Sequence, residues 1–309
     1  MTGNNKTLKG LILTATAAIV WGIAGTFAQY LFSGGYASPI WITNIRLFFS
    51  GIILLSYSFF KYGKRSTEIL KSTRSVIMLL VFGLFGLTSS QLTYYMAINY
   101  SNAGTATVLQ YLGPTLIVIY VCLTTKRLPT RTEVFAILFA ITGTVIVSTR
   151  GNLNTLSISP LALTWGLLSA FAMMTYTLMP GKLIAAWGST IVNSYAMLFA
   201  GTVLLFIIRP WTYDVVINFK TLVSIAAIVI LGTAIGFTLY LQGVSDIGPV
   251  AASTIAFIEP LSATVCSSVF LGTKFLPIDI VGFAFIMTSV IVVAISKTRS
   301  SKKNASTGG

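Results

Sequence analysis

Two oppositely charged residues lie within stretches of sequence that are otherwise apolar or small. Glu259 falls within the stretch 249–271, and Arg46 falls within the stretch 38–60. Burying an isolated charge is costly, so each side chain needs a partner, water or a function. Two chemistries fit these residue types. The two groups form an ion pair that neutralises both, which we favour, or Glu259 takes up and releases a proton.

Polar and aromatic residues gather around two prolines, Pro114 and Pro260. A proline within a helix removes a backbone donor and bends the helix, which frees the carbonyl groups of Gln110 and Ala256 to accept a hydrogen bond from a ligand. The alternative is a static bend that serves packing, with nearby hydroxyls bonded to their own helices. We favour bent helices that line a central cavity and flex at the prolines. The candidate cavity residues are Trp21, Arg46, Gln91, Tyr94, Gln110, Tyr240, Thr254 and Glu259.

Several kinds of chemistry have few residues to support them. The sequence contains no His and two Cys, Cys122 and Cys266, both in apolar stretches. This composition predicts neither a zinc-type site nor a disulfide framework. No Walker-type phosphate loop is present, and six acidic residues are few for a membrane-embedded transferase. We therefore expect no catalytic residue, no metal site and no cofactor.

The composition places these residues in a membrane. Of 309 residues, 55% are hydrophobic and only 8% are charged, whereas soluble proteins carry about 25% charged residues. Apolar stretches of about 20 residues predict an all-α integral membrane protein with ten transmembrane helices. The expected helices cover residues 10–32, 38–60, 75–98, 102–123, 132–149, 158–179, 189–208, 221–242, 249–271 and 277–295.

The second half of the sequence repeats features of the first half. A shift of 146 positions places Gly86 on Gly232, Tyr94 on Tyr240 and Pro114 on Pro260. Two sets of five helices, 1–149 and 150–309, then enter the membrane from opposite sides, because five is an odd number. Such inverted repeats are typical of transporters that alternate between two conformations of similar energy. The alternative is a duplication that serves packing alone.

The net charge of +14 reflects the distribution of Lys and Arg rather than an affinity for nucleic acid. With a cytoplasmic amino terminus, 15 of these residues fall in inner segments and 4 in outer segments. This bias follows the positive-inside rule. We therefore expect a multi-pass plasma-membrane protein, with both termini in the cytoplasm, anionic lipid headgroups near the basic residues and a short disordered basic tail.

Several landmarks make the sequence similar to a known family. They are the first-helix stretch 17–22 (AAIVWG), Pro39, Arg46, Gly113-Pro114 and Glu259-Pro260, combined with a helix–short loop–helix unit that closes each repeat. Together they resemble the EamA-type family of the drug/metabolite transporter superfamily over essentially the whole chain. The resemblance implies a bacterial inner-membrane carrier of amino acids and related metabolites. One difference is that the loops after the fourth and ninth helices, where this family often has Glu, carry Lys126-Arg127 and Lys274.

The favoured function is a secondary carrier that moves small polar or amphipathic metabolites by alternating access, with export as the expected direction. A carrier of phosphorylated or nucleotide-linked sugars is less favoured, because such substrates need several cations in the cavity. A channel or a non-transporting scaffold is the third possibility. The sequence leaves open the substrate, the coupling ion and whether the chain forms a homodimer.

Overall fold

The computed structural model describes residues 3–153, 155–248, 251–252 and 255–306, and within these ranges it contains helices and no strand. Eight helical runs are long and apolar enough to cross a membrane, as expected for a multi-pass membrane protein. These runs are Thr7–Ser33, Pro39–Tyr62, Thr73–Tyr100, Ala103–Thr124, Arg131–Thr149, Pro160–Leu178, Ser189–Ile208 and Phe219–Ile247. The ninth and tenth predicted spans correspond to shorter apolar helices, Ile258–Leu271 and Pro277–Val292.

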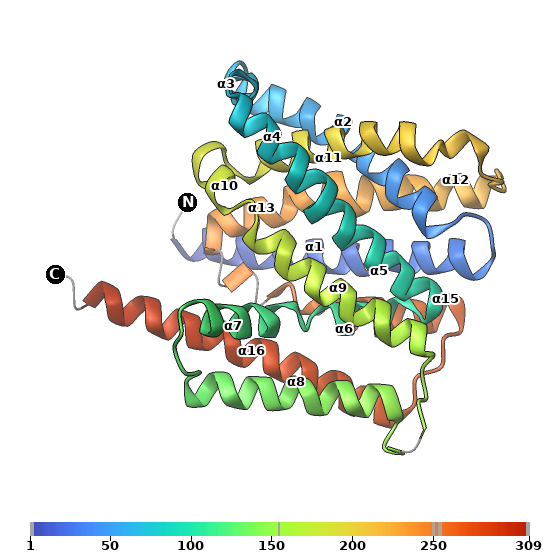
Figure 1. The fold of residues 1–309 in the computed structure, drawn as a ribbon, viewed down its shortest axis with the longest axis vertical. Coiled ribbons are helices and arrows are strands. Elements are labelled where there is room, and N and C mark those ends of the chain that lie inside the picture. Colours follow the sequence, from blue (N-terminus) through green and yellow to red (C-terminus); the bar gives the residue numbers. More distant parts are fainter. Residues whose placement is uncertain (1–2, 154, 249–250, 253–254, 307–309) are drawn as a thin grey trace.

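The helices carry the labels of Figure 1. The first half contains α1 (Gly3–Ser33), α2 (Pro39–Tyr62), α3 (Arg65–Glu68), η1 (Ile69–Lys71), α4 (Thr73–Val81), η2 (Phe82–Leu87), α5 (Thr88–Tyr100), α6 (Ala103–Gln110), α7 (Gly113–Thr124) and α8 (Arg131–Thr149). The second half contains α9 (Pro160–Leu178), α10 (Gly181–Trp187), α11 (Ser189–Ile208), η3 (Pro210–Thr212), α12 (Phe219–Ala226), η4 (Ala227–Ile235), α13 (Gly236–Ile247), α15 (Ile258–Leu271) and α16 (Pro277–Ser306). The segments η2 and η4 are π-helical.

The carboxyl-terminal tail differs from its prediction. It was expected to be disordered, but α16 continues through the tail to Ser306. The chain offers no glycine or proline between Gly282 and Gly308 to end the helix earlier.

Helix starts follow local capping chemistry. The Asn102 side chain accepts a hydrogen bond of 2.8 Å from the backbone N–H of Thr105, which begins α6 directly after the turn that follows α5. Thr130 and Glu133 form a capping box at the start of α8. These side chains satisfy backbone donors that would otherwise be left unpaired at a helix end.

The packing pairs helices of the first half with helices of the second. In Figure 1, α2 lies along α11 and α8 lies along α16, and both are among the most extensive contacts in the molecule. Between these two pairs, α1 packs on α13 and α15, while α9 packs on α5, α6 and α7. Each half therefore completes its core with helices of the other half.

Backbone features recur at the spacing of 146 positions that relates the two halves of the sequence. Gly63 and Arg209, which follow α2 and α11, both have positive φ angles, 55° and 51°. Lys126 and Gly272 also have positive φ angles, 51° and 65°. The π-helical segment η2, shifted by the same spacing, falls within η4. A left-handed residue is uncommon unless it is Gly, so these matches are informative.

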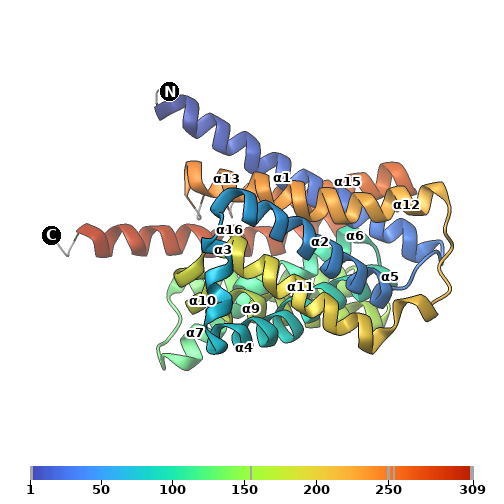
Figure 2. The same cartoon turned by 90° about the horizontal axis from the view of Figure 1, so that it is seen from above.

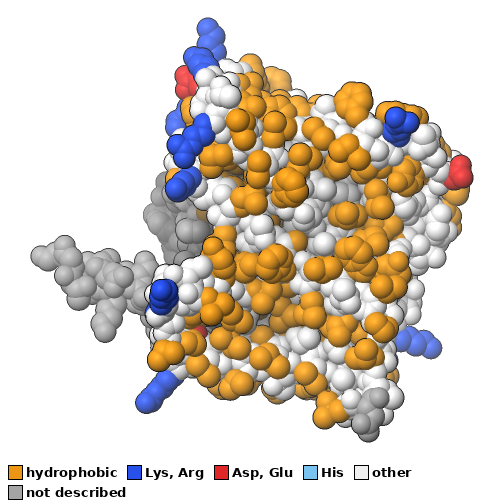
Figure 3. Space-filling model, viewed as in Figure 1, with side chains coloured by type: hydrophobic (Ala, Val, Ile, Leu, Met, Phe, Trp, Pro, Cys, Tyr) orange, Lys and Arg blue, Asp and Glu red, His pale blue; other side chains and the backbone are white. Residues whose placement is uncertain are grey.

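The surface in Figure 3 is covered largely by apolar side chains, with Lys and Arg gathered mainly at the edge near the two chain ends. Phe60, Leu123 and Phe270 are 93%, 73% and 75% exposed. A surface of this kind is suited to lipid rather than to water.

Candidate functional site

A central cavity of about 400 Å³ lies between the two halves. Seven of the predicted cavity residues, together with Pro114, line it: Trp21, Arg46, Gln91, Tyr94, Gln110, Tyr240 and Glu259. Thr254 lies outside the described residues. Pro260 is buried within α15 and does not line the cavity.

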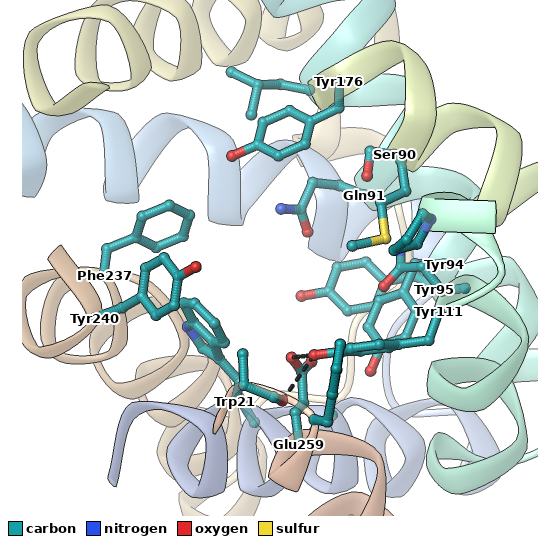
Figure 4. Close-up of a pocket in the computed structure, with 18 of the residues that line it drawn as sticks. Trp21, Ser90, Gln91, Tyr94, Tyr95, Tyr111, Tyr176, Phe237, Tyr240 and Glu259 are labelled. Carbon is teal, nitrogen blue, oxygen red and sulfur yellow. Dashed lines mark hydrogen bonds between the residues drawn. The ribbon is translucent and has the colours of Figure 1, made fainter. Parts of the chain in front are cut away.

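Glu259 lies in the first turn of α15 and faces the cavity (Figure 4). The Tyr111 hydroxyl lies 3.0 Å from Oε2 of Glu259 and 2.9 Å from the carbonyl oxygen of Ala256, so its proton serves both acceptors. The Ala256 carbonyl also accepts a hydrogen bond from the backbone N–H of Glu259, at 3.0 Å. The protein itself therefore satisfies this carbonyl, which sequence reasoning had left free for a ligand.

The expected ion pair between Arg46 and Glu259 is not formed in this structure. Among the described residues, ion pairs within 4.0 Å join Arg127 to Glu133 and Arg150 to Asp279. All six acidic residues lie within the described part of the chain, so Arg46 has no carboxylate partner.

Uncharged groups hold the guanidinium of Arg46 instead. It donates hydrogen bonds of 2.6 Å to the Tyr95 hydroxyl, 3.3 Å to the Thr233 hydroxyl and 3.2 Å to the Gly232 carbonyl. These bonds anchor Arg46 to α5 and η4 while it lines the cavity. Every acceptor is neutral, so these bonds give Arg46 no hydrogen-bonded ionic partner. The guanidinium has five N–H donors, and these contacts do not use all of them.

Aromatic rings form another wall of the cavity. The Trp21 ring packs 5.2 Å from Tyr240 and 5.6 Å from Phe237, measured between centroids. Gly236 makes this packing possible, because a Cβ there would overlap the Trp21 indole nitrogen. That nitrogen is buried and has no hydrogen-bond partner in the protein. A buried donor without a partner is uncommon in native proteins, and here it packs against Gly236.

Hydrogen bonds join α1, α5, α6 and the loop after α15 beside the cavity residue Tyr94. The Tyr94 and Thr107 hydroxyls lie 2.8 Å apart. The Gln29 side chain donates to the Thr273 hydroxyl and accepts from the Ala103 N–H, both at 2.8 Å. Gln29 lies near the end of α1 and Ala103 begins α6, and the end of α1 is remote from both chain termini (Figure 1).

Both prolines stand at the start of a new helix instead of within a bent one. Pro114 is the second residue of α7, after a break at Tyr111 and Leu112, and Pro260 is the third residue of α15. The residues before the two new helices, Tyr111 and Phe257, have similar ψ angles of −1° and −7°. Their rings meet edge to face at 5.7 Å, so the two breaks are in direct contact.

Some lining residues were not among the predicted candidates. Tyr95 and Tyr111 belong to the polar group around the prolines, and the structure adds their roles as partners of Arg46 and Glu259. Tyr176 lies in α9, which drew no attention in the sequence, and it stacks on Phe82 at 5.7 Å. A lone Tyr within an apolar helix is a weak signal that could have identified it.

Comparisons with known proteins agree with this architecture. The profile of the EamA-like transporter family matches residues 8–149 and 160–295. The "Uncharacterized inner membrane transporter YicL" of Salmonella typhimurium is 38% identical over 96% of this chain and 99% of its own length. The "Uncharacterized transporter YyaM" of Bacillus subtilis is 23% identical over 97% of this chain and 99% of its own.

One crystal structure shares the fold, with a TM-score of 0.63 and 16% sequence identity, over 94% of this chain and 98% of the other. The family profile and the Salmonella relative both cover nearly the whole chain. The protein is therefore a membrane transporter of the EamA-like transporter family.

Proposed function

We propose that the protein is a secondary transporter of small amphipathic zwitterions, such as amino acids, and that it exports them by alternating access. The observation that carries this proposal is a carboxyl group, Glu259, and a guanidinium, Arg46, that line one membrane-embedded cavity without forming a direct ion pair. A zwitterion supplies both missing partners, with its ammonium group at Glu259 and its carboxylate at Arg46.

The rest of the cavity suits an amphipathic molecule. The rings of Trp21, Phe237 and Tyr240 offer apolar contact to a side chain. A phosphorylated substrate carries more negative charge than this site can balance, because Arg46 is the one cation among the described lining residues. A carrier of phosphorylated or nucleotide-linked sugars is therefore disfavoured.

Two inverted five-helix repeats, 1–149 and 150–309, with ten spans, account for the arrangement of helices. The reciprocal contacts support this organisation, because α1 packs on α13 and α15 as α9 packs on α5 and on the pair α6 and α7. The positive φ angles and π-helical segments at matched positions give further support. Two halves of similar structure have access to two conformations of similar energy, which alternating access requires.

We also propose that the cavity in this conformation opens toward the cytoplasm. The basic residues near the chain ends favour a cytoplasmic location for both termini. The closing contacts of Gln29 and Tyr94 lie on the other side of the cavity. The cavity then faces the cytoplasm, where an exporter loads its substrate. The Salmonella relative is named as an inner membrane transporter, and we assign this chain to the same kind of membrane.

The test is a metabolite profile of the medium from cells that overproduce the protein, the Glu259→Gln variant or the Glu68→Gln variant. Glu68 is an exposed acidic residue in the short helix α3, so its replacement controls for loss of an acidic charge. We expect enrichment of amino acids with the wild type and Glu68→Gln, and none with Glu259→Gln. In proteoliposomes, saturable counterflow identifies a carrier, non-saturable flux identifies a channel, and absence of any flux would refute transport.

A further inference from the structure

We propose that a lateral groove between α1, α12 and α15 is a binding site for a phospholipid with an anionic headgroup. One acyl chain occupies the groove, and the headgroup lies at Lys220. This site is separate from the central cavity, and the inference does not depend on the identity of the transported substrate.

The groove has a volume of about 400 Å³, similar to that of the central cavity. Its walls are almost entirely apolar, and its residues are Ile23, Thr26, Phe27, Tyr30, Phe219, Lys220, Val223, Ser224, Cys266, Phe270 and Leu271. The hydroxyls of Thr26 and Ser224 donate to carbonyls of their own helices, Gly22 and Lys220, at 3.1 and 2.8 Å. They therefore offer little to a polar ligand.

The groove opens toward the surrounding lipid. Phe219 and Phe270, from the helices on its two sides, are 81% and 75% exposed. In Figure 2, α1, α12 and α15 lie together along one side of the molecule. An apolar hollow does not hold water well, and protein atoms do not fill this one. In a bilayer the available material of matching polarity is a lipid acyl chain.

Lys220 supplies the polar end of the site. Among the described residues that line the groove it is the one with a charge, and it lies in the first turn of α12, at the end of a membrane span. None of the six acidic residues, all of which are described, pairs with it within 4.0 Å. A lysine at this position extends toward the headgroup layer, where it attracts anionic phosphate groups. The chemistry therefore favours an anionic headgroup over a zwitterionic one.

An occupied groove has a structural consequence for α1. Ile23, Thr26 and Phe27 form the floor of the groove on the turns that follow Trp21. A bound acyl chain holds α12 and α15 apart above α1 and supports the helix that carries the cavity indole.

The test is native mass spectrometry of the full chain in a mild detergent, with equal amounts of phosphatidylglycerol and phosphatidylethanolamine added. We expect one retained lipid per chain, with roughly a five-fold preference for phosphatidylglycerol from one lysine–headgroup attraction. Lys220→Gln removes the preference, whereas Lys274→Gln, at an exposed lysine outside the groove, keeps it. Equal preference in wild type and Lys220→Gln would overturn the assignment of the headgroup.

A second pair of variants tests the acyl chain. Val223→Trp fills the groove and abolishes retention, whereas Leu222→Trp, on a lipid-facing position of the same helix outside the groove, leaves it unchanged. Cys266 gives a readout that needs no substitution, because it lines the groove as a free thiol. Added phosphatidylglycerol should slow the alkylation of Cys266 by N-ethylmaleimide. The rate is measured by mass spectrometry of the peptide that contains this residue. An unchanged alkylation rate, or retention by Val223→Trp equal to that of Leu222→Trp, would overturn the site.

Discussion

Replacing Glu259 with Gln tests how the cavity recognises its substrate. The amide keeps the shape of the side chain and an oxygen that still accepts from the Tyr111 hydroxyl, now at 3.0 Å, so the local structure should persist. What is lost is the negative charge. A hydrogen bond to a charged group contributes about 1.5–3 kcal/mol, against about 0.5–1.5 kcal/mol for a neutral one. The difference of about 1–1.5 kcal/mol weakens binding of an ammonium group roughly 5- to 12-fold.

The assay is inhibition of counterflow in proteoliposomes by three probes with the same aromatic ring. Phenylalanine carries both charges, phenethylamine lacks the carboxylate, and 3-phenylpropionate lacks the ammonium group. We expect Glu259→Gln to weaken the first two and to leave 3-phenylpropionate unchanged. Arg46→Gln should weaken phenylalanine and 3-phenylpropionate and leave phenethylamine unchanged, because its charge is the partner of the carboxylate.

The pattern across the three probes shows whether Glu259 binds the ammonium group, because a general loss of activity would weaken all three probes equally. If Glu259→Gln weakens every probe by the same factor, the carboxylate is not the ammonium partner and the reasoning fails. The control variants are Glu68→Gln and Arg74→Gln, both at exposed positions outside the cavity. They should bind all three probes as the wild type does.

Four further outcomes are expected. If Glu259 also carries a proton during the cycle, the pH dependence of transport is lost in Glu259→Gln, and an unchanged pH profile argues against proton coupling. Gln29→Leu removes two hydrogen bonds on the closed side, worth about 1–3 kcal/mol together, and amide hydrogen exchange over residues 100–107 should accelerate. Asp279→Asn breaks a pair with one largely buried member and should lower unfolding free energy in detergent by about 1–3 kcal/mol, against less than about 1 kcal/mol for Glu133→Gln in the more exposed pair. Gly22→Ala places a Cβ against the backbone of α15 and should cost about 1–3 kcal/mol, whereas Gly181→Ala, with open space around it, should be close to neutral.

The sequence predicted the class of structure and much of the cavity for the same reason. A bilayer forces the backbone into helices, so stretches of apolar residues locate them. The same solvent penalises polar side chains unless they face the protein interior. Gln91, Tyr94 and Glu259 were therefore recognisable as lining residues before their contacts were known.

The predicted ion pair between Arg46 and Glu259 was wrong, because the sequence does not indicate which partners these side chains meet. The sequence gives the depth of Arg46 and Glu259 along their helices, but the direction in which each points depends on how the helices are rotated against their neighbours. Packing of α2 against α5 and η4 directs Arg46 to the Tyr95 hydroxyl. That rotation is a tertiary property, and a single sequence read by itself contains no direct signal for it.

The prolines show a similar limit in the backbone. Proline predicts an interruption, but it does not distinguish a bend from a new helix start, because proline is also favoured in the first turn of a helix. In both halves the proline lies in the first turn of a new helix, and Pro114 and Pro260 each follow a break. The short π-helical segments η2 and η4 had no sequence signal that we recognised.

In the proposed transport cycle, the contact between the two breaks would link substrate recognition to the movement of the halves. Tyr111 and Phe257 occupy matched positions, 146 residues apart, and their rings touch at 5.7 Å. In a molecule with two inverted halves, matched residues in mutual contact lie at the pseudo-two-fold axis. The Tyr111 hydroxyl also holds the Glu259 carboxylate. In the proposed alternating-access cycle, a rotation of one half against the other would act on the group that positions this carboxylate, so the proposed ammonium site would change as the cavity changes sides.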